Sequence, residues 1–269
     1  MLKEIIIENV YDFDTAHIFD CGQCFRWNND IGVVGSYVCK ATYDEEKHLL
    51  KLETNGGTKE FWQNYFDLDT DYSAIKKMLA ASDPDIIPAL EYGQGIRILN
   101  QDIFETIISF IVSQNNNIPR IKKCIEAICA RYGEQLGEYF GEMRYSFPSA
   151  GVLAEADVCD LAELKLGYRC EYIVSAARQY LKFGAPADYD ELLSYPGIGP
   201  KVANCIMLFG LHSVEAFPID TWVKHIMNDM YGFEKNDVKG MTGFARDRFG
   251  NYAGYAQQYL FYFYREKKD

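Results

Sequence analysis

The chain has 269 residues, a length that suits one large domain or two to three ordinary ones. It is 48% hydrophobic and 15% aromatic, which provides a sizeable core and argues against an intrinsically disordered protein. The net charge of −12 argues against binding nucleic acid through overall positive charge, although local patches or helix N-termini can hold phosphate on an acidic protein. Composition alone therefore favours a small-molecule enzyme.

Targeting and metal signals are weak in this sequence. Apolar runs fall short of the roughly 20 residues that span a bilayer, and the first ten residues place glutamates inside their apolar stretch. We therefore expect a soluble cytoplasmic protein with reduced thiols and no membrane partner; a nucleoid-associated or nuclear location stays open. The pair Cys21 and Cys24 lacks a second C-x-x-C, and the chain lacks a four-cysteine cluster, so the sequence predicts no metal and no iron–sulfur site.

Residues 1–95 carry strand signals followed by helical ones. Short β-branched and aromatic runs alternate with turn residues, and two amphipathic runs follow. These features predict an N-terminal antiparallel β domain with one or two helices. The predicted strands cover 5–9, 25–28, 32–43 and 48–55, and the predicted helices cover 58–68 and 72–82.

Residues 96–269 show helical periodicity throughout. We expect an all-α domain of at least six helices, so that the whole chain is an α+β protein. The predicted helices cover 102–114, 118–132, 171–184, 201–211, 220–232 and 252–268.

The stretch SYPGIGPKVANC, residues 194–205, predicts a hairpin between two helices. Gly197 and Gly199 leave backbone N–H groups free in a tight turn, and Pro200 suits the first position of a helix. Such amides at a helix N-terminus form a concave site for an anion such as a phosphate.

Lys201 follows this turn, where the helix dipole disfavours a positive charge. On a helix it shares a face with the apolar residues Cys205, Leu208 and Phe209. Burial and the helix N-terminus would lower the pKa of Lys201 and make its amine a nucleophile. The alternative is a lysine that points sideways into solvent.

Asp220 precedes a predicted helix with an apolar face. Aspartate is a preferred N-cap, so capping alone could explain it. The same carboxylate could also lie near the Lys201 amine, where it would stabilise positive charge or transfer a proton.

Five segments together resemble a known family. They are CGQCFRW (21–27), SQNNNIPRI (113–121), LGYRCEYI (166–173), the hairpin with the later FPIDTW (217–222), and YAGYAQQYLF (252–261). The hairpin, its lysine and an aspartate about twenty residues on are similar to the helix–hairpin–helix DNA glycosylase superfamily. The whole set resembles the 8-oxoguanine DNA glycosylase/lyase family, in the expected order.

The resemblance implies a twisted antiparallel β domain packed on a mainly α-helical domain, and an enzyme of base excision repair. It would flip 8-oxoguanine out of duplex DNA, because a stacked base is out of reach. Lys201 matches the nucleophile that attacks C1′ and forms a Schiff base permitting β-elimination, and Asp220 matches the catalytic carboxylate.

The resemblance also assigns the base pocket and the DNA contacts. Gly22 matches the glycine whose carbonyl accepts the N7–H of 8-oxoguanine, and an N7 lone pair on guanine would repel that carbonyl. Each position has a structural alternative, such as a turn, a core residue, a loop or a solvated helix end. The remaining matches are Cys205 and Phe261 around the base, Gln257 on its Watson–Crick edge, Asn115 in the vacated space, Tyr168 as wedge, and Arg120 and Arg169 at the opposite cytosine.

One residue departs from the family pattern, and several alternative functions remain. Trp222 stands where the family often has a histidine near phosphate, which leaves phosphate contact or pocket shape open. Rivals are thymine-glycol, adenine or alkylated-base glycosylases and a non-catalytic DNA-binding module. The first two usually carry an iron–sulfur cluster, and a phosphate-binding module needs neither the lysine nor the aspartate. We expect a monomer acting on double-stranded DNA without a cofactor; a monovalent or divalent cation on the hairpin carbonyls stays open.

Overall fold

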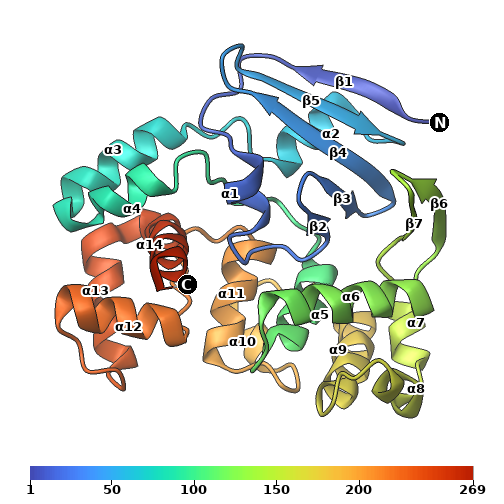
Figure 1. The fold of residues 1–269 in the computed structure, drawn as a ribbon. Coiled ribbons are helices and arrows are strands. Elements are labelled where there is room, and N and C mark those ends of the chain that lie inside the picture. The colour runs from blue at the N-terminus through green and yellow to red at the C-terminus, as the bar shows by residue number, and fades with distance from the viewer. Residues whose placement is uncertain (269) are drawn as a thin grey trace.

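The computed structural model describes residues 1–268 and places one antiparallel sheet against a larger set of helices (Figure 1). The strands of this sheet lie in the spatial order β1-β5-β4-β3-β2. They are β1 (Lys3–Ile7), β2 (Trp27–Asn28), β3 (Ile31–Val34), β4 (Tyr37–Asp44) and β5 (Leu49–Thr54).

The sheet has its own hydrophobic core on one face. In β5, buried and partly exposed residues alternate, as the two-residue period of a strand requires. Leu52 pairs with Ile5 of β1 and with Ala41 of β4, and it is fully buried. The core includes Trp62 of the helix α2 (Lys59–Tyr65), so this helix covers the buried face.

The helices from residue 72 onward form the second and larger core, whereas the buried residues of the two helices before them belong to the core of the sheet. The described residues form fourteen α-helices. They are α1 (Thr15–Phe19), α2, α3 (Tyr72–Ser82), α4 (Ile87–Tyr92), α5 (Ile103–Ser113), α6 (Ile118–Tyr132), α7 (Ala150–Glu155), α8 (Val158–Glu163), α9 (Arg169–Phe183), α10 (Tyr189–Leu193), α11 (Pro200–Gly210), α12 (Thr221–Tyr231), α13 (Val238–Phe249) and α14 (Ala253–Lys268), with short 3-10 turns at Pro84–Ile86 and Gly250–Tyr252.

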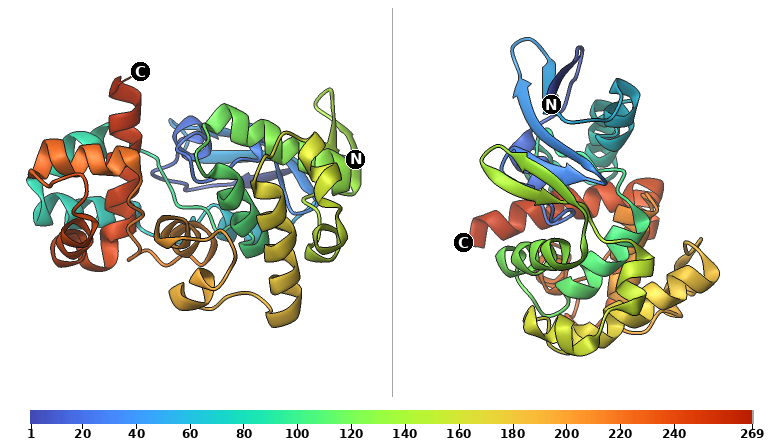
Figure 2. Two further views of the ribbon diagram at one scale, coloured as in Figure 1. Left: turned by 90° about the horizontal axis from the view of Figure 1, so that it is seen from below. Right: turned by 90° about the vertical axis from the view of Figure 1, so that its right-hand side faces the viewer.

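The helices gather around α11. Figures 1 and 2 show α12, α13 and α14, together with α3 and α4, on one side of α11, and α5, α6 and α9 on the other. The buried residues of α3 and α4 belong to this larger core, although the sequence places these helices with the sheet. Within the described residues, no helix is long and apolar enough to cross a membrane.

Two local predictions are corrected by the structure. The helical part contains a two-stranded hairpin, β6 (Gln135–Tyr139) and β7 (Glu142–Tyr145), so residues 96–269 are not all-α. Its turn uses Phe140 and Gly141, both with positive φ. Asparagine or aspartate usually precedes the glycine in such a turn, so a phenylalanine there does not indicate a hairpin in the sequence. The predicted strand 32–43 is two strands, because Gly35 turns the chain between Val34 and Tyr37.

Candidate active site

The predicted hairpin joins α10 to α11. Gly197 has φ +83°, and a Cβ added there would lie 2.5 Å from the ring of Tyr172 on α9, so the turn requires glycine. Gly199 occupies the N-cap position of α11 but has no side chain that could accept a hydrogen bond from the helix, and Pro200 is the first residue of that helix. Free backbone N–H groups therefore remain at this helix N-terminus, as an anion site needs.

Lys201 lies in the first turn of α11 and lines a cavity together with Cys205 and Phe209, one and two turns further on. Its Nζ also lies over the ring of Phe110, 5.8 Å from the centroid. The lysine therefore points into the protein, and the alternative of a solvent-directed side chain is wrong.

The expectation that the pKa of Lys201 is lowered is also wrong for the free protein. The pKa is raised above its ordinary value, first by the interaction with Cys205 and also by the Asp220 carboxylate, and burial opposes both. Burial raises the pKa of the Cys205 thiol, and Lys201 works against this. From the sequence, Cys205 shares the helix face of Lys201 and Asp220 could lie near its amine, but only burial and the helix dipole enter the predicted pKa. Lys201 is thus an ammonium at neutral pH and must lose a proton before it can act as a nucleophile.

Asp220 is the N-cap of α12, and its Oδ1 accepts a hydrogen bond from the backbone N–H of Val223 at 2.8 Å. The structural role foreseen for this residue is therefore present. Burial raises the pKa of Asp220, while the Val223 N–H and Lys201 lower it. A carboxylate with a raised pKa is a better proton acceptor than an exposed one, so capping and proton transfer are compatible here.

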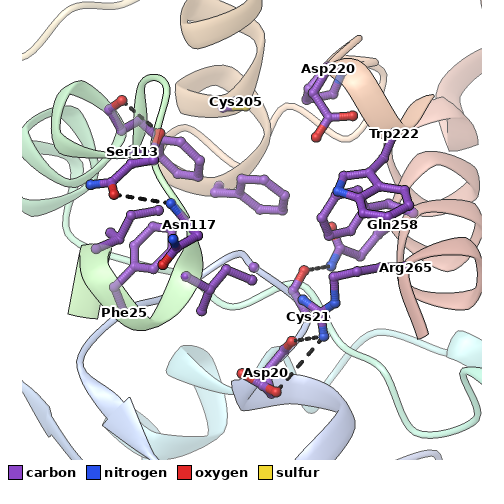
Figure 3. Close-up of a pocket in the computed structure, with 18 of the residues that line it drawn as sticks. Asp20, Cys21, Phe25, Ser113, Asn117, Cys205, Asp220, Trp222, Gln258 and Arg265 are labelled. Carbon is purple, nitrogen blue, oxygen red and sulfur yellow. Dashed lines mark hydrogen bonds and ion pairs between the residues drawn. The ribbon is translucent and has the colours of Figure 1, made fainter. Parts of the chain in front are cut away.

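A cavity of about 560 Å³ brings the predicted catalytic and base-pocket residues together. It opens between α11, the start of α12, α14, the α5–α6 junction and the loop after α1 (Figure 3). All six residues that the sequence assigned to chemistry or to the base line it: Gly22, Lys201, Cys205, Asp220, Gln257 and Phe261.

Gly22 and Phe261 meet at one wall of this cavity. Gly22 has φ +80°, and a Cβ added there would lie 3.2 Å from the Phe261 ring. Gln257 is one turn before Phe261 on α14, only 5% exposed, and its Oε1 is buried without a hydrogen-bond partner. A buried acceptor without a partner costs free energy, which a ligand that donates a hydrogen bond there can recover.

The predicted DNA contacts cluster on a neighbouring surface. Asn115 is exposed with φ +46°, and its Nδ2 donates to the hydroxyl of Tyr168 at 3.3 Å. Tyr168 is 51% exposed at the start of α9. Arg120 is exposed and donates to the carbonyl of Lys165 at 3.3 Å. These three side chains are accessible to a duplex before any rearrangement.

Arg169 differs from the other three because it is only 4% exposed. Its guanidinium donates to the carbonyls of Gln114 and Asn115 and, at 3.0 Å, to that of Leu166. In the free protein this arginine therefore holds the Asn115 loop against the start of α9. To contact a cytosine it would have to release part of this network.

Several cavity-lining residues were not predicted. Phe25 lies inside the quoted CGQCFRW segment, and Trp222 was noted only as a departure; its ring lies beside Gln258 and Arg265 (Figure 3). The indole thus contributes to the shape of the cavity. Side chains of this kind give no local sequence signal, because the cavity joins segments far apart in the chain. Others include Phe110, Phe209, Gln258 and Arg265.

Comparisons with known proteins agree with this arrangement. The family model for the 8-oxoguanine DNA glycosylase N-terminal domain matches residues 5–107, and that for HhH-GPD superfamily base excision DNA repair proteins matches residues 108–248. The N-glycosylase/DNA lyase of Saccharomyces cerevisiae is 30% identical over 91% of this chain and 82% of its own length. A probable N-glycosylase/DNA lyase of Methanothermobacter thermautotrophicus is 33% identical over 73% and 70%.

Solved structures give the same result. The 8-oxoguanine glycosylase/lyase of Clostridium acetobutylicum, in complex with duplex DNA containing cytosine opposite 8-oxoguanine, is 38% identical. It superposes with a TM-score of 0.92 over 100% of this chain and 99% of its own. The 3-methyladenine DNA-glycosylase of Archaeoglobus fulgidus, 21% identical with a TM-score of 0.77, shares the fold.

The family resemblance and the α+β fold predicted from the sequence are therefore confirmed. The chain belongs to the 8-oxoguanine DNA glycosylase/lyase family within the HhH-GPD superfamily of base excision DNA repair proteins.

Proposed function

We propose that this enzyme excises 8-oxoguanine from duplex DNA and then cleaves the strand, with Lys201 as the nucleophile and Asp220 as the proton-transferring carboxylate. The observation that carries the proposal is the shared cavity: amine, carboxylate and four base-pocket residues line one space of about 560 Å³. A guanine-sized base fits a cavity of this size.

The chemistry starts from the ammonium form of Lys201. A proton passes from Nζ to the Asp220 carboxylate, whose raised pKa suits this acceptor role. The freed lone pair forms a bond to C1′ while the bond from C1′ to the base breaks. The electron pair leaves with the base, which takes up the proton that Asp220 received from Lys201. Opening of the sugar ring gives a Schiff base on Lys201, and loss of a C2′ proton then expels the 3′-phosphate.

Base selection rests on Gly22 and Gln257. The Gly22 carbonyl would accept the N7–H that 8-oxoguanine has and guanine lacks, and the unpartnered Oε1 of Gln257 would accept from the Watson–Crick edge. Cys205 and Phe261 would enclose the base from two sides. Loss of one bond together with lone-pair repulsion supports a selectivity of at least ~100-fold, which is about 2.7 kcal/mol.

The exposed cluster beside the cavity would hold the distorted duplex. Asn115 would fill the space of the flipped nucleotide, Tyr168 would wedge beside it, and Arg120 with Arg169 would contact the estranged cytosine. Filling the gap offsets unstacking, which costs a few kcal/mol per base step. The free amides at Gly197 and Gly199 would bind the backbone phosphate. Action as a monomer without a cofactor, and a cation on the hairpin carbonyls, stay predictions.

The test uses a duplex with one 8-oxoguanine opposite cytosine. Wild-type protein is expected to release the base, to cleave the strand without alkali, and to form a covalent complex with borohydride. Lys201→Gln is expected to abolish all three, because the glutamine amide is not nucleophilic. Lys77→Gln, on the exposed face of α3, is the matched control and is expected to act like wild type. Covalent trapping that persists in Lys201→Gln would contradict the proposal that Lys201 is the nucleophile.

A further inference from the structure

The loop that carries Gly22 is fastened to α14 by two side chains. Nε2 of Gln258 donates to the backbone carbonyl of Cys21 at 2.8 Å. The guanidinium of Arg265 donates to the backbone carbonyl of Asp20. Both interactions appear in Figure 3 as links from the last helix to the loop below it. Two consecutive carbonyls, immediately before Gly22, are therefore held by one helix.

Both fastening side chains are buried. Gln258 is 2% exposed and Arg265 is 8% exposed, so water cannot readily replace either bond. They project from the same helix as Gln257 and Phe261, which line the base cavity. The helix α14, which would contact the base through Gln257 and Phe261, thus also fixes the position of the loop that carries Gly22.

A second clamp holds the loop from its other side. Gln23 is 1% exposed; its Nε2 donates to the carbonyls of Ile18 and Arg97, at 3.1 and 2.7 Å, and its Oε1 accepts from the N–H of Leu99. Gly22 therefore sits between two fastened neighbours. Within residues 1–268, the hydrogen bonds that fasten this loop engage the carbonyls of Asp20, Cys21 and Gln23, and none of them uses the Gly22 carbonyl.

We propose that Gln258 and Arg265 are positioning residues that aim the Gly22 carbonyl into the cavity and thereby set the discrimination between 8-oxoguanine and guanine. This inference rests on the proposed role of Gly22. A hydrogen bond to N7–H and repulsion of an N7 lone pair both weaken steeply with distance and angle. Binding constellations need positions within about 0.5 Å, which supporting hydrogen bonds provide. Neither residue touches the reacting sugar in this assignment.

The experiment compares three duplexes in single turnover: one with 8-oxoguanine, one with guanine at the same position, and one with a preformed abasic site. Gln258→Met keeps side-chain length and removes the donor. We expect its preference for 8-oxoguanine over guanine to fall about tenfold, the value of one hydrogen bond near 1.4 kcal/mol. Cleavage at the abasic site needs no base contact and is expected to stay within twofold of wild type.

Arg265 provides an independent pair of variants. Arg265→Met is expected to lower the same preference, and Arg265→Lys is expected to restore part of it, because an ammonium can still donate to the Asp20 carbonyl. Asn228→Leu is the control: it removes a bond of the same chemical type, from a side-chain amide to the carbonyl of Phe233 at 2.7 Å, at an exposed position away from the cavity. Its preference is expected to match wild type.

An unchanged preference in Gln258→Met and Arg265→Met would overturn the inference. So would an equal loss on all three duplexes, since that pattern is the mark of a general structural defect. If the wild-type protein itself removes guanine as fast as 8-oxoguanine, the role of Gly22 fails and this inference fails with it. The wild-type measurement thus separates the two failures.

Discussion

The base cavity and the exposed Asn115–Tyr168 cluster are built in different ways. Around the cavity, side chains are mostly buried or half-buried, and hydrogen bonds such as Gln258 to Cys21 fasten segments that lie far apart in the chain. The cluster has exposed side chains, a strained backbone at Asn115, and one contact of 3.3 Å between Asn115 and Tyr168. The buried Arg169 holds the Asn115 loop from beneath.

This difference matches the two tasks assigned to the regions. Discrimination between bases that differ at N7 needs fixed positions, and a preorganised cavity supplies them. Insertion into a duplex needs accessible groups that can move as the DNA bends. Variants in the cavity should therefore change rates and selectivity, whereas variants in the cluster should change DNA affinity.

The largest effect is expected on the cavity side, from Asp220→Asn. Asparagine retains N-capping of α12 but cannot accept the proton of Lys201, so base excision should fall at least about 100-fold with little change in stability. Single-turnover kinetics and urea unfolding measure the two quantities. Asp237→Asn, at the N-cap of α13, is the matched control. A wild-type excision rate in Asp220→Asn would show that Asp220 serves only as the N-cap of α12.

The pH dependence of excision tests the charge state of Lys201. In the proposed mechanism the proton moves from the Lys201 ammonium to the Asp220 carboxylate without exchange with water. Because the pKa of Lys201 lies above the ordinary 10.5, this charged pair persists between pH 6 and 9, and the single-turnover excision rate should be nearly constant there. The rate should fall at acid pH, where Asp220, whose pKa is raised, takes up a proton and can no longer accept one. The stabilising contribution of the ammonium is fully present below its ordinary pKa and is lost only as the pH rises above it, so this contribution does not change between pH 6 and 9. A rate that rises about tenfold per pH unit in this range would show instead that Lys201 loses its proton to water before it reacts.

Gly197→Ala probes the hairpin that supports both regions. The new Cβ meets the Tyr172 ring at 2.5 Å and forces a positive φ on alanine, so we expect a loss of about 2 kcal/mol in the free energy of unfolding. Gly199→Ala has a negative φ and open space at its Cβ, and should cost less than about 1 kcal/mol. Urea denaturation compares the two, and equal losses would contradict the close packing of Gly197.

Tyr168→Ala is expected to give the smallest effect and to act on affinity alone. The ring is 51% exposed, so the free energy of unfolding should change by less than about 0.5 kcal/mol. Affinity for a duplex with an abasic site should fall about tenfold through lost stacking. Fluorescence anisotropy measures this, with Tyr11→Ala, 54% exposed on the sheet side, as control. Equal affinities of the two variants for this duplex would contradict the proposed role of Tyr168 as a wedge.

Local patterns predicted the elements that carry the chemistry. The double-glycine turn with Pro200 placed Lys201 in the first turn of α11, and the residue type of Asp220 predicted its N-cap. Gly22, Gln257 and Phe261 came from the family resemblance, because a lone glycine or a phenylalanine in an aromatic run carries no functional signal.

What could not be predicted depends on long-range contacts. The bond from Gln258 to Cys21 spans 237 residues, and Asp220, which contributes to the raised pKa of Lys201, comes from a different helix. Helical periodicity gives one face of each helix but not its neighbours. The β6–β7 hairpin was not predicted for a local reason: its turn uses phenylalanine where asparagine or aspartate is usual.

Mapping the borohydride-trapped complex tests the central claim most directly. The wild-type protein is trapped on a duplex with 8-oxoguanine, digested, and analysed by mass spectrometry for the lysine that carries the reduced sugar remnant. We predict the remnant on Lys201, in the peptide that contains the turn from Gly197 to Gly199. A remnant on another lysine or on the N-terminal amine, with Lys201 unmodified, would contradict it.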